Sequence, residues 1–297
     1  MTKRYDAGKV ITAMVTPFSR DLKVDYEGAE TLVKHLVRTG SDSILIAGTT
    51  GESPTLSVDE KFELLSSVKR ACANKAKVIF GAGSNSTENA VKTVKMAEKE
   101  GADAILSVVP YYNKPSQSGI IAHFSKIAES TNLPIFLYNI PSRTGVNMTV
   151  ETVKLLAEKY ENIVGLKQSY FDLDVISELK IACPEDFTIY SGDDSLTLPM
   201  MSLGVEGVIS VASHLWCNEI KTMIHNFENG NYIFAKNMHL KLYPIFKKMF
   251  MAPNPVPVKA ALEKAGLIKS CVRLPLVELN DSEKAELYET IDKFMAE

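Results

Sequence analysis

A lysine stands inside an apolar run of the sequence, in the stretch from Ile163 to Ser169. An ammonium group is costly to bury, so in an interior strand the pKa of this lysine would fall and some neutral amine would be present. A neutral amine attacks carbonyl carbons and forms Schiff bases, which makes Lys167 a candidate nucleophile. The alternative is that Lys167 ends the strand with its charged head in water, and this stretch alone leaves both readings open.

A small-residue segment follows another apolar run, from Gly48 to Pro54. Its backbone N–H groups and the hydroxyls of Thr49 and Thr50 suit a bound carboxylate or phosphate. The glycines alone are equally typical of a flexible connection. Two adjacent threonines at the end of a strand favour substrate binding.

Tyrosines and an arginine stand near the ends of two further apolar runs. Tyr138 could point into a barrel or outward to a helix, and a core tyrosine would be unremarkable. Arg143 follows on the next loop, where it could be a solvated charge or a bidentate clamp for a carboxylate. Tyr111 and Tyr112 lie on another loop, and two exposed rings indicate an interface or a site.

The elements that must position these residues alternate regularly along the chain. Short β-branched runs are separated by longer amphipathic stretches, which is typical of βα units around a parallel sheet. The expected strands are Val10 to Val15, Ser43 to Ala47, Lys77 to Gly81, Ala104 to Val109, Ile135 to Asn139, Ile163 to Gln168, Phe187 to Ser191 and Gly207 to Val211. The expected helices between them are Tyr26 to Thr39, Val58 to Ala73, Thr87 to Glu100, Gly119 to Thr131, Val150 to Tyr160, Asp174 to Cys183, Ser195 to Leu203 and His214 to Asn226.

Eight strands, each followed by a helix, predict the α/β class and a closed (β/α)8 TIM barrel with its site at the carboxyl ends of the strands. A doubly wound open sheet is the alternative, but no glycine-rich phosphate fingerprint follows the first strand. After residue 226 the sequence shows only helical patterns, at 231–250, 256–265 and 282–295. We therefore expect a catalytic barrel over 1–226 and a C-terminal helical extension packed on it over 227–297.

Composition narrows the functional classes. A net charge of -3 gives no general attraction to nucleic acid or anionic membranes. The four cysteines are widely spaced, no membrane span occurs, and Met1 to Asp6 runs into a charged segment, so a cytoplasmic protein is expected. The histidines are scattered and no nucleotide motif is present. We expect neither a metal nor any other cofactor.

Taken together, six motifs resemble those of the dihydrodipicolinate synthase and N-acetylneuraminate lyase superfamily. Their order and spacing agree over nearly the whole chain, which makes the resemblance specific although each motif alone is weak. The motifs are Gly48 to Ser53, Tyr138 to Gly145, Gly165 to Ser169, Ser191 to Asp194, Gly207 to Ser210 and Ala252 to Lys259.

The resemblance implies a Schiff-base enzyme that uses pyruvate. Arg143 stands where the synthases of this superfamily carry an arginine, which implies condensation of pyruvate with aspartate 4-semialdehyde at the entry to lysine and diaminopimelate synthesis. A sugar-acid aldolase that shares Lys167 and Tyr138 is the first alternative. A barrel that only binds a keto acid, without catalysis, is the second.

Residue roles carry over from the resemblance one by one. It implies that Lys167 forms the imine and that Tyr138, Thr50 and Tyr112 relay protons, with Tyr112 entering from a neighbouring subunit of a homo-oligomer, a dimer or a tetramer. It also implies substrate binding by a second set of residues, namely Thr49, Thr50, Arg143, Gly192 and Ile209.

Inhibition by lysine is the one family property that the sequence argues against. Lysine-sensitive bacterial relatives typically carry two histidines and a glutamate where this chain has Val58, Lys61 and Asn89. Losing the acid that would meet an ammonium, with Lys61 nearby, weakens a site for a cationic ligand. We expect weak or no inhibition by lysine.

Overall fold

A computed structural model of the protein describes residues 5–170 and 172–296. Eight strands form a closed barrel in the order β1-β2-β3-β4-β5-β6-β7-β8. Each lies within a segment where the sequence predicts a strand, and the ends differ by two residues at most. The bounds are β1 Val10–Ala13, β2 Ser43–Ile46, β3 Lys77–Gly81, β4 Ala104–Val108, β5 Ile135–Asn139, β6 Ile163–Gln168, β7 Thr188–Ser191 and β8 Gly207–Ser210.

The expected helices are present, with small shifts at their ends. They are α1 Tyr26–Arg38, α2 Val58–Cys72, α3 Thr87–Lys99, α4 Gln117–Ala128, α6 Val150–Lys159, α7 Leu173–Ala182, α9 Ser213–Glu228, α10 Tyr232–Lys248, α11 Val256–Lys264 and α12 Asp281–Ala296. Ser57 caps α2, because its hydroxyl accepts from Glu60 N while the Glu60 carboxylate accepts from Ser57 N.

Short helical elements correct the sequence reading in three segments. The helix expected over Ser195 to Leu203 is divided into a 3-10 turn, η2 (Asp194–Leu196), and α8 (Thr197–Met201). The segments after β2 and β5, expected as loops, each contain a short helix, namely η1 (Ser53–Thr55) and α5 (Pro141–Thr144). Each has a proline in its first turn, where the fixed φ suits helical entry and no N–H is lost. Elements of three or four residues are too short to show a hydrophobic period, so the sequence pattern does not predict them.

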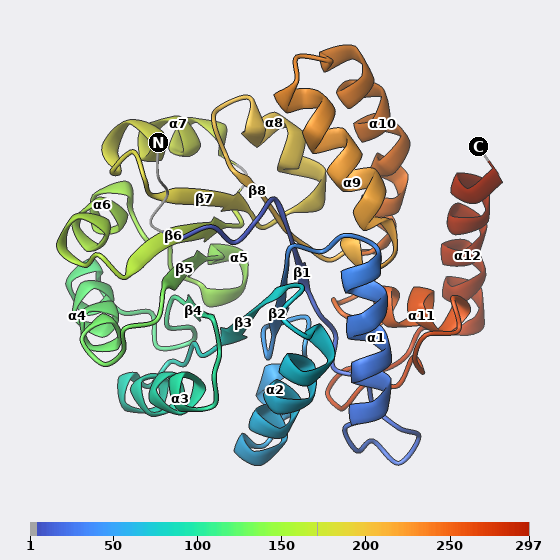
Figure 1. Cartoon of the computed structure of the whole chain (residues 1–297), viewed down its shortest axis with the longest axis horizontal. Coiled ribbons are helices and arrows are strands. Elements are labelled where there is room, and N and C mark those ends of the chain that lie inside the picture. Colours follow the sequence, from blue (N-terminus) through green and yellow to red (C-terminus); the bar gives the residue numbers. More distant parts are fainter. Residues whose placement is uncertain (1–4, 171, 297) are drawn as a thin grey trace. The chain divides into compact units, whose positions relative to one another are not determined.

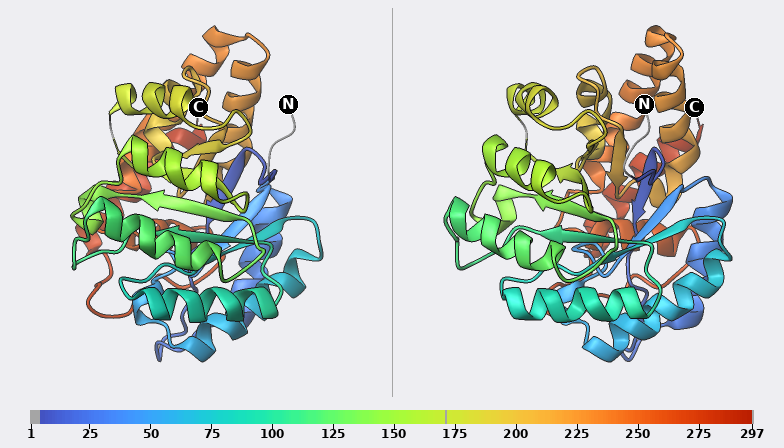
Figure 2. Two further views of the ribbon diagram at one scale, coloured as in Figure 1. Left: turned by 90° about the vertical axis from the view of Figure 1, so that its left-hand side faces the viewer. Right: turned by 60° about the vertical axis from the view of Figure 1, so that its left-hand side comes forward.

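By compactness the chain divides into two units, and the first comprises Met1–Gly8 and Ile79–Ile209. Strands β4 to β8 run parallel within it, and β5 and β6 are in register so that Tyr138 lies opposite Lys167. Helices α3, α4 and α6 pack side by side along these strands (Figure 2). The rings of Phe136 and Tyr190 meet edge to face, and the Tyr190 hydroxyl donates to Gly8 O.

The second unit comprises Lys9–Val78 and Ser210–Glu297. Strands β1 and β2 pair within it, α1 packs on α2, and α10 packs on both α9 and α12 (Figure 1). Helix α9 ends at Glu228, and the expected division between barrel and extension at residue 226 stays a prediction. Among the described residues, no helix combines the length and apolar character that a membrane crossing needs.

Candidate active site

Lys167 lies near the carboxyl end of β6, a strand whose six residues are all buried. The side chain is buried as well, with the whole residue 7% exposed. Its Nζ lies 4.5 Å from the ring centroid of Tyr138 on the neighbouring strand β5. Within the described part of the chain Lys167 has no ion-pair partner. The structure therefore favours the buried amine over a lysine with its head in water, and it turns the ring of Tyr138 toward that amine.

Gly192 provides the space that Lys167 occupies. It follows β7, and its N–H donates to Gln168 O on β6. A Cβ atom at position 192 would lie 1.8 Å from Ser169 Oγ and 3.1 Å from Lys167 Cε. Since a real Cβ does not approach a side-chain oxygen that closely, only glycine fits here without displacing Ser169 or the lysine. Ile209 of β8, the other expected pocket residue, is buried.

Arg143 lies on α5, directly after β5, and its side chain is exposed. The backbone around it is held by Asn139, the last residue of β5. The Asn139 amide donates to Asn147 Oδ1 and Gln168 Oε1, and its Oδ1 accepts from Met148 N. Arg143 is thus presented to solvent on a fixed backbone, as a residue that binds an incoming carboxylate requires. Asn139 was not singled out from the sequence, since an asparagine at the end of a predicted strand carries no signal of the residues it will contact.

Tyr112 is largely exposed to solvent, at 88%. It lies in the segment after β4 with a left-handed φ of 74°, which is uncommon for an aromatic residue. The next residue fixes the segment, because Asn113 Nδ2 donates to Asn85 O. Lys114 runs close to Gly145, where a Cβ would lie 2.8 Å from Lys114 Cε. The segments that carry Tyr112 and Arg143 are therefore neighbours, and the Tyr112 side chain lies at the surface.

Thr49 and Thr50 belong to the second unit, directly after β2, and differ in exposure. Thr49 is exposed, whereas Thr50 is 4% exposed. Asn254 Nδ2 donates to Thr50 Oγ1 over 2.9 Å, and Thr16 Oγ1 donates to Gly51 O over 2.7 Å. This segment is therefore held by hydrogen bonds, which argues against a flexible connection.

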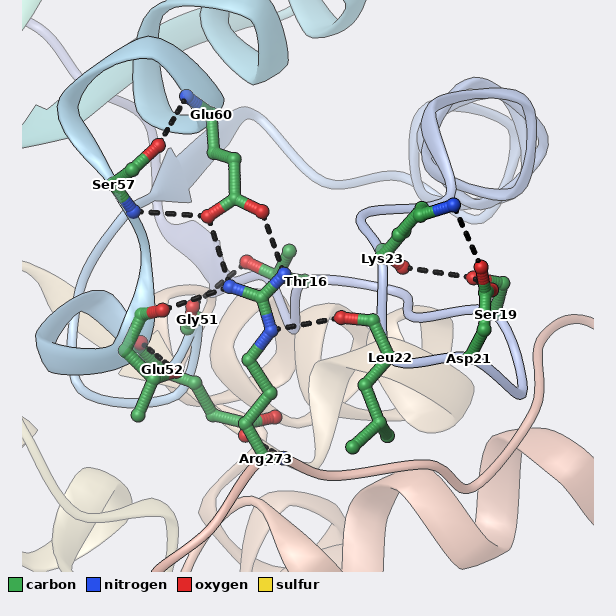
Figure 3. Close-up of polar contacts among 11 residues, drawn as sticks. Thr16, Ser19, Asp21, Leu22, Lys23, Gly51, Glu52, Ser57, Glu60 and Arg273 are labelled. Carbon is green, nitrogen blue, oxygen red and sulfur yellow. Dashed lines mark hydrogen bonds and ion pairs between the residues drawn. The ribbon is translucent and has the colours of Figure 1, made fainter.

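A buried ion pair lies two residues further along. Lys259 Nζ is 2.5 Å from Glu52 Oε1 and also donates to Cys271 O, while Arg273 N donates to Glu52 Oε2. Figure 3 shows the guanidinium of Arg273 reaching the Glu60 carboxylate on one side and Leu22 O on the other. Burial lowers the pKa of Lys259 to about 8, although the carboxylate of Glu52 acts in the opposite direction.

The sequence reasoning missed this anchoring of the 48–55 segment by 252–273. The available signal was a proline-rich turn with a lysine shortly after it, at Pro253 to Lys259. Nothing in that pattern says which residues it would contact about 200 positions away. No group of three or more His, Cys, Asp or Glu side chains that could hold a metal ion occurs among the residues described by the structure.

The fold and these residues together define a class, the (β/α)8 barrels that carry a buried lysine beside a tyrosine at the carboxyl ends of their strands. Residues 6–294 match the Dihydrodipicolinate synthetase family. A 4-hydroxy-tetrahydrodipicolinate synthase of Desulforamulus reducens is 52% identical over 278 residues, which cover 94% of each chain. The synthase of Bacillus subtilis is 47% identical over 286 residues, or 96% of this chain and 99% of that one.

A solved structure agrees at the level of the fold. The crystal structure of the lysine-bound dihydrodipicolinate synthase of Cyanidioschyzon merolae superposes with a TM-score of 0.95 at 48% identity and covers 97% of this chain and 98% of that one. The chain belongs to the dihydrodipicolinate synthetase family. The resemblance drawn from the six motifs is confirmed.

Proposed function

We propose that the protein condenses pyruvate with L-aspartate 4-semialdehyde to give 4-hydroxy-tetrahydrodipicolinate, the first committed step toward lysine and diaminopimelate. The observation that carries this is the buried Lys167 with its Nζ 4.5 Å from the Tyr138 ring, in a chain about half identical to synthases of that reaction over nearly its whole length. Arg143 on the β5 segment distinguishes the synthases from sugar-acid aldolases of similar chemistry.

In the proposed mechanism Lys167 attacks the ketone carbon of pyruvate, and loss of water gives an imine. The positively charged imine nitrogen acts as an electron sink when the methyl group loses a proton. The resulting enamine carbon adds to the aldehyde of the semialdehyde. The amine of that substrate then closes the ring onto the imine carbon and releases Lys167 as the free amine.

Three hydroxyls move the protons in this proposal, those of Tyr138, Thr50 and Tyr112. Tyr112 acts in the site of a neighbouring subunit, and its exposure supports that assignment. Replacing Tyr112 with Phe should lower turnover by about tenfold or more with an unchanged melting temperature. Full activity in a folded Tyr112→Phe variant would remove it from the relay.

Carboxylate recognition is divided between two sets of groups. Thr49 and Thr50 hold the pyruvate carboxylate through backbone N–H and hydroxyl groups, and Arg143 holds the carboxylate of the semialdehyde. Gly192 and Ile209 shape the pocket around the lysine. The packing of Lys167 against the empty face of Gly192 supports this placement.

The proposed assembly is a homo-oligomer, a dimer or a tetramer, located in the cytoplasm. An aromatic residue as exposed as Tyr112 supports an interface, and four cysteines that form no disulfide suit a reducing compartment. In this proposal residues 1–226 form the catalytic barrel and 227–297 its helical extension. Sedimentation velocity on wild-type protein would show the size of the assembly, and a monomer with full activity would contradict the role of Tyr112.

The deciding experiment is a rate assay on the purified protein. Pyruvate and aspartate semialdehyde are supplied, product is followed through a coupled reductase, and cleavage of N-acetylneuraminate is measured in parallel. Fast condensation without cleavage is expected. Cleavage without condensation would favour the sugar-acid aldolase, and failure of both together with failure to trap an imine would favour a keto-acid-binding barrel.

Resistance to lysine is part of the proposal. Val58 and Asn89 are exposed and carry no charge, and burial lowers the pKa of Lys61 without supplying the carboxylate that a bound ammonium needs. Initial rates should therefore be unchanged by millimolar L-lysine. Inhibition in the micromolar range would contradict this.

A further inference from the structure

The side chain of Asn254 contacts the hydroxyl that the proposed relay requires. Its Nδ2 lies 2.9 Å from Thr50 Oγ1, a buried hydrogen bond between residues 204 positions apart. Asn254 is 9% exposed and Thr50 4%. Within the described part of the chain this is the one hydrogen bond of the Thr50 side chain.

The bond has a direction, because an amide nitrogen donates and does not accept. Thr50 Oγ1 is therefore the acceptor, and its own hydrogen must be directed to another group. The oxygen keeps a second lone pair that can accept a proton, and its own hydrogen can be donated to another group, as a relay requires. Without Asn254 the hydroxyl could rotate among several orientations.

The other groups of the 252–273 segment hold the neighbouring backbone instead of the hydroxyl. Lys259 and the backbone of Arg273 both bind the carboxylate of Glu52. Arg273 also donates to Thr55 O and to both oxygens of Glu60 (Figure 3). The 48–55 segment is thus fixed independently of Asn254.

The second polar atom of the Asn254 amide excludes a simple packing role. Asn254 Oδ1 is buried and has no hydrogen-bond partner among the described residues. An unpartnered buried carbonyl is unfavourable, and an apolar side chain of similar size would fill the space without that cost. What the amide supplies at this position is the N–H donor toward Thr50.

We propose that Asn254 is a positioning residue for the condensation, which holds Thr50 Oγ1 as an acceptor so that the hydroxyl hydrogen points along the proton relay. The proposal rests on the proposed role of Thr50. It assigns Asn254 no contact with substrate, so its effect on the reaction passes through Thr50 alone.

A double-mutant cycle tests this. Asn254→Ala should lower kcat about tenfold, as expected for the loss of one neutral hydrogen bond, and borohydride should still trap pyruvate on Lys167. In a Thr50→Val background the same substitution should leave kcat unchanged, because the group through which it acts is absent. An effect of equal size in both backgrounds would overturn the positioning role. An unaltered kcat in Thr50→Val alone would instead remove Thr50 from the relay and with it the role of Asn254, while the proposed condensation would stand.

Two further variants guard the interpretation. Asn254→Asp keeps the size of the side chain, but an ionised carboxylate offers only acceptors and would attract the hydrogen of the Thr50 hydroxyl. We therefore expect kcat to fall at least as far as in Asn254→Ala. A wild-type kcat in Asn254→Asp would overturn the proposal even if the alanine variant fails to fold. Asn162→Ala is the matched control, since Asn162 Nδ2 donates to Ala128 O and Thr131 O. It should lower the melting temperature and leave the kcat of the folded enzyme unchanged.

Discussion

The protein buries two lysines in different ways. Lys259 is 0% exposed, and its charge meets the Glu52 carboxylate, Cys271 O and the face of Phe18, whose ring centroid lies 4.1 Å from Nζ. Lys167 is also buried, but it faces only the ring of Tyr138 in the described part of the chain. Lys259 is surrounded by groups that stabilise a fixed charge, whereas Lys167 is left with its amine uncommitted.

The different surroundings of Lys259 and Lys167 suit a structural role for the first and a chemical role for the second. A protonated lysine that donates to a carboxylate and a carbonyl has no lone pair to offer. A lysine against an aromatic ring, beside a glycine that leaves room at its Cε, can meet a carbonyl carbon. The partners of a buried lysine, more than its burial, therefore indicate what it does.

The largest effect should come from removing the uncommitted amine. Lys167→Ala is expected to lower turnover by at least about a thousandfold, since the covalent step is lost and other residues of the site cannot replace it. Borohydride reduction with pyruvate, followed by peptide mass spectrometry, should label Lys167 in the wild type and no residue in the variant. A label on Lys259 would mean that Lys259, and not Lys167, is the nucleophilic lysine.

Crowding Lys167 should be nearly as damaging as deleting it. Gly192→Ala would place a Cβ 1.8 Å from Ser169 Oγ, so Ser169 and the lysine must move. We expect a loss of about 1–3 kcal/mol in the free energy of unfolding and a decrease of tenfold or more in the rate of imine formation. Gly192→Ala combined with Ser169→Gly should recover part of both. If Gly192→Ala forms the imine at the wild-type rate, the glycine is not needed to place the lysine.

At Lys259 the effect should appear in stability. Lys259→Met leaves the carboxylate of Glu52 buried without its counter-charge, which should lower the free energy of unfolding by about 3–5 kcal/mol. Removing the charge from both partners, in Glu52→Gln with Lys259→Met, should restore part of that loss. Urea unfolding measures both, and a Lys259→Met variant as stable as wild type would show that the pair is not a structural anchor.

The smallest effect concerns pH. Hydrogen bonds from the Arg273 guanidinium hold the pKa of Glu60 near 2, below its ordinary value near 4.5. The unfolded chain therefore binds more protons in this range, and this contribution to stability is lost as the pH falls from about 4.5 to 2. Arg273→Met should be less stable than wild type at pH 6, and the difference should shrink toward pH 3. A constant difference in urea titrations would exclude this linkage.

The sequence predicts the strands and helices better than it predicts the contacts between them. All eight strands and the long helices could be predicted, because alternating apolar runs and amphipathic stretches are local patterns. The turn of helix after Ile140 and the one at Ser53 could not, since three or four residues carry no period. Lys167, Tyr138 and Arg143 were identified by type and motif, while Asn139 and Asn254 were not, because the sequence around an asparagine does not show which distant residues its amide will contact.

The sequence by itself determined the class of fold, the family, and the candidates for chemistry at Lys167, Tyr138 and Thr50, because periodicity and motif spacing are properties of neighbouring residues. Only the tertiary structure decided that Lys167 is buried against Tyr138, that Gly192 leaves it room, that Lys259 anchors the 48–55 segment, and that Asn254 donates to the Thr50 hydroxyl. These contacts join residues up to 207 positions apart. They follow from how strands and helices pack, and no local pattern specifies that.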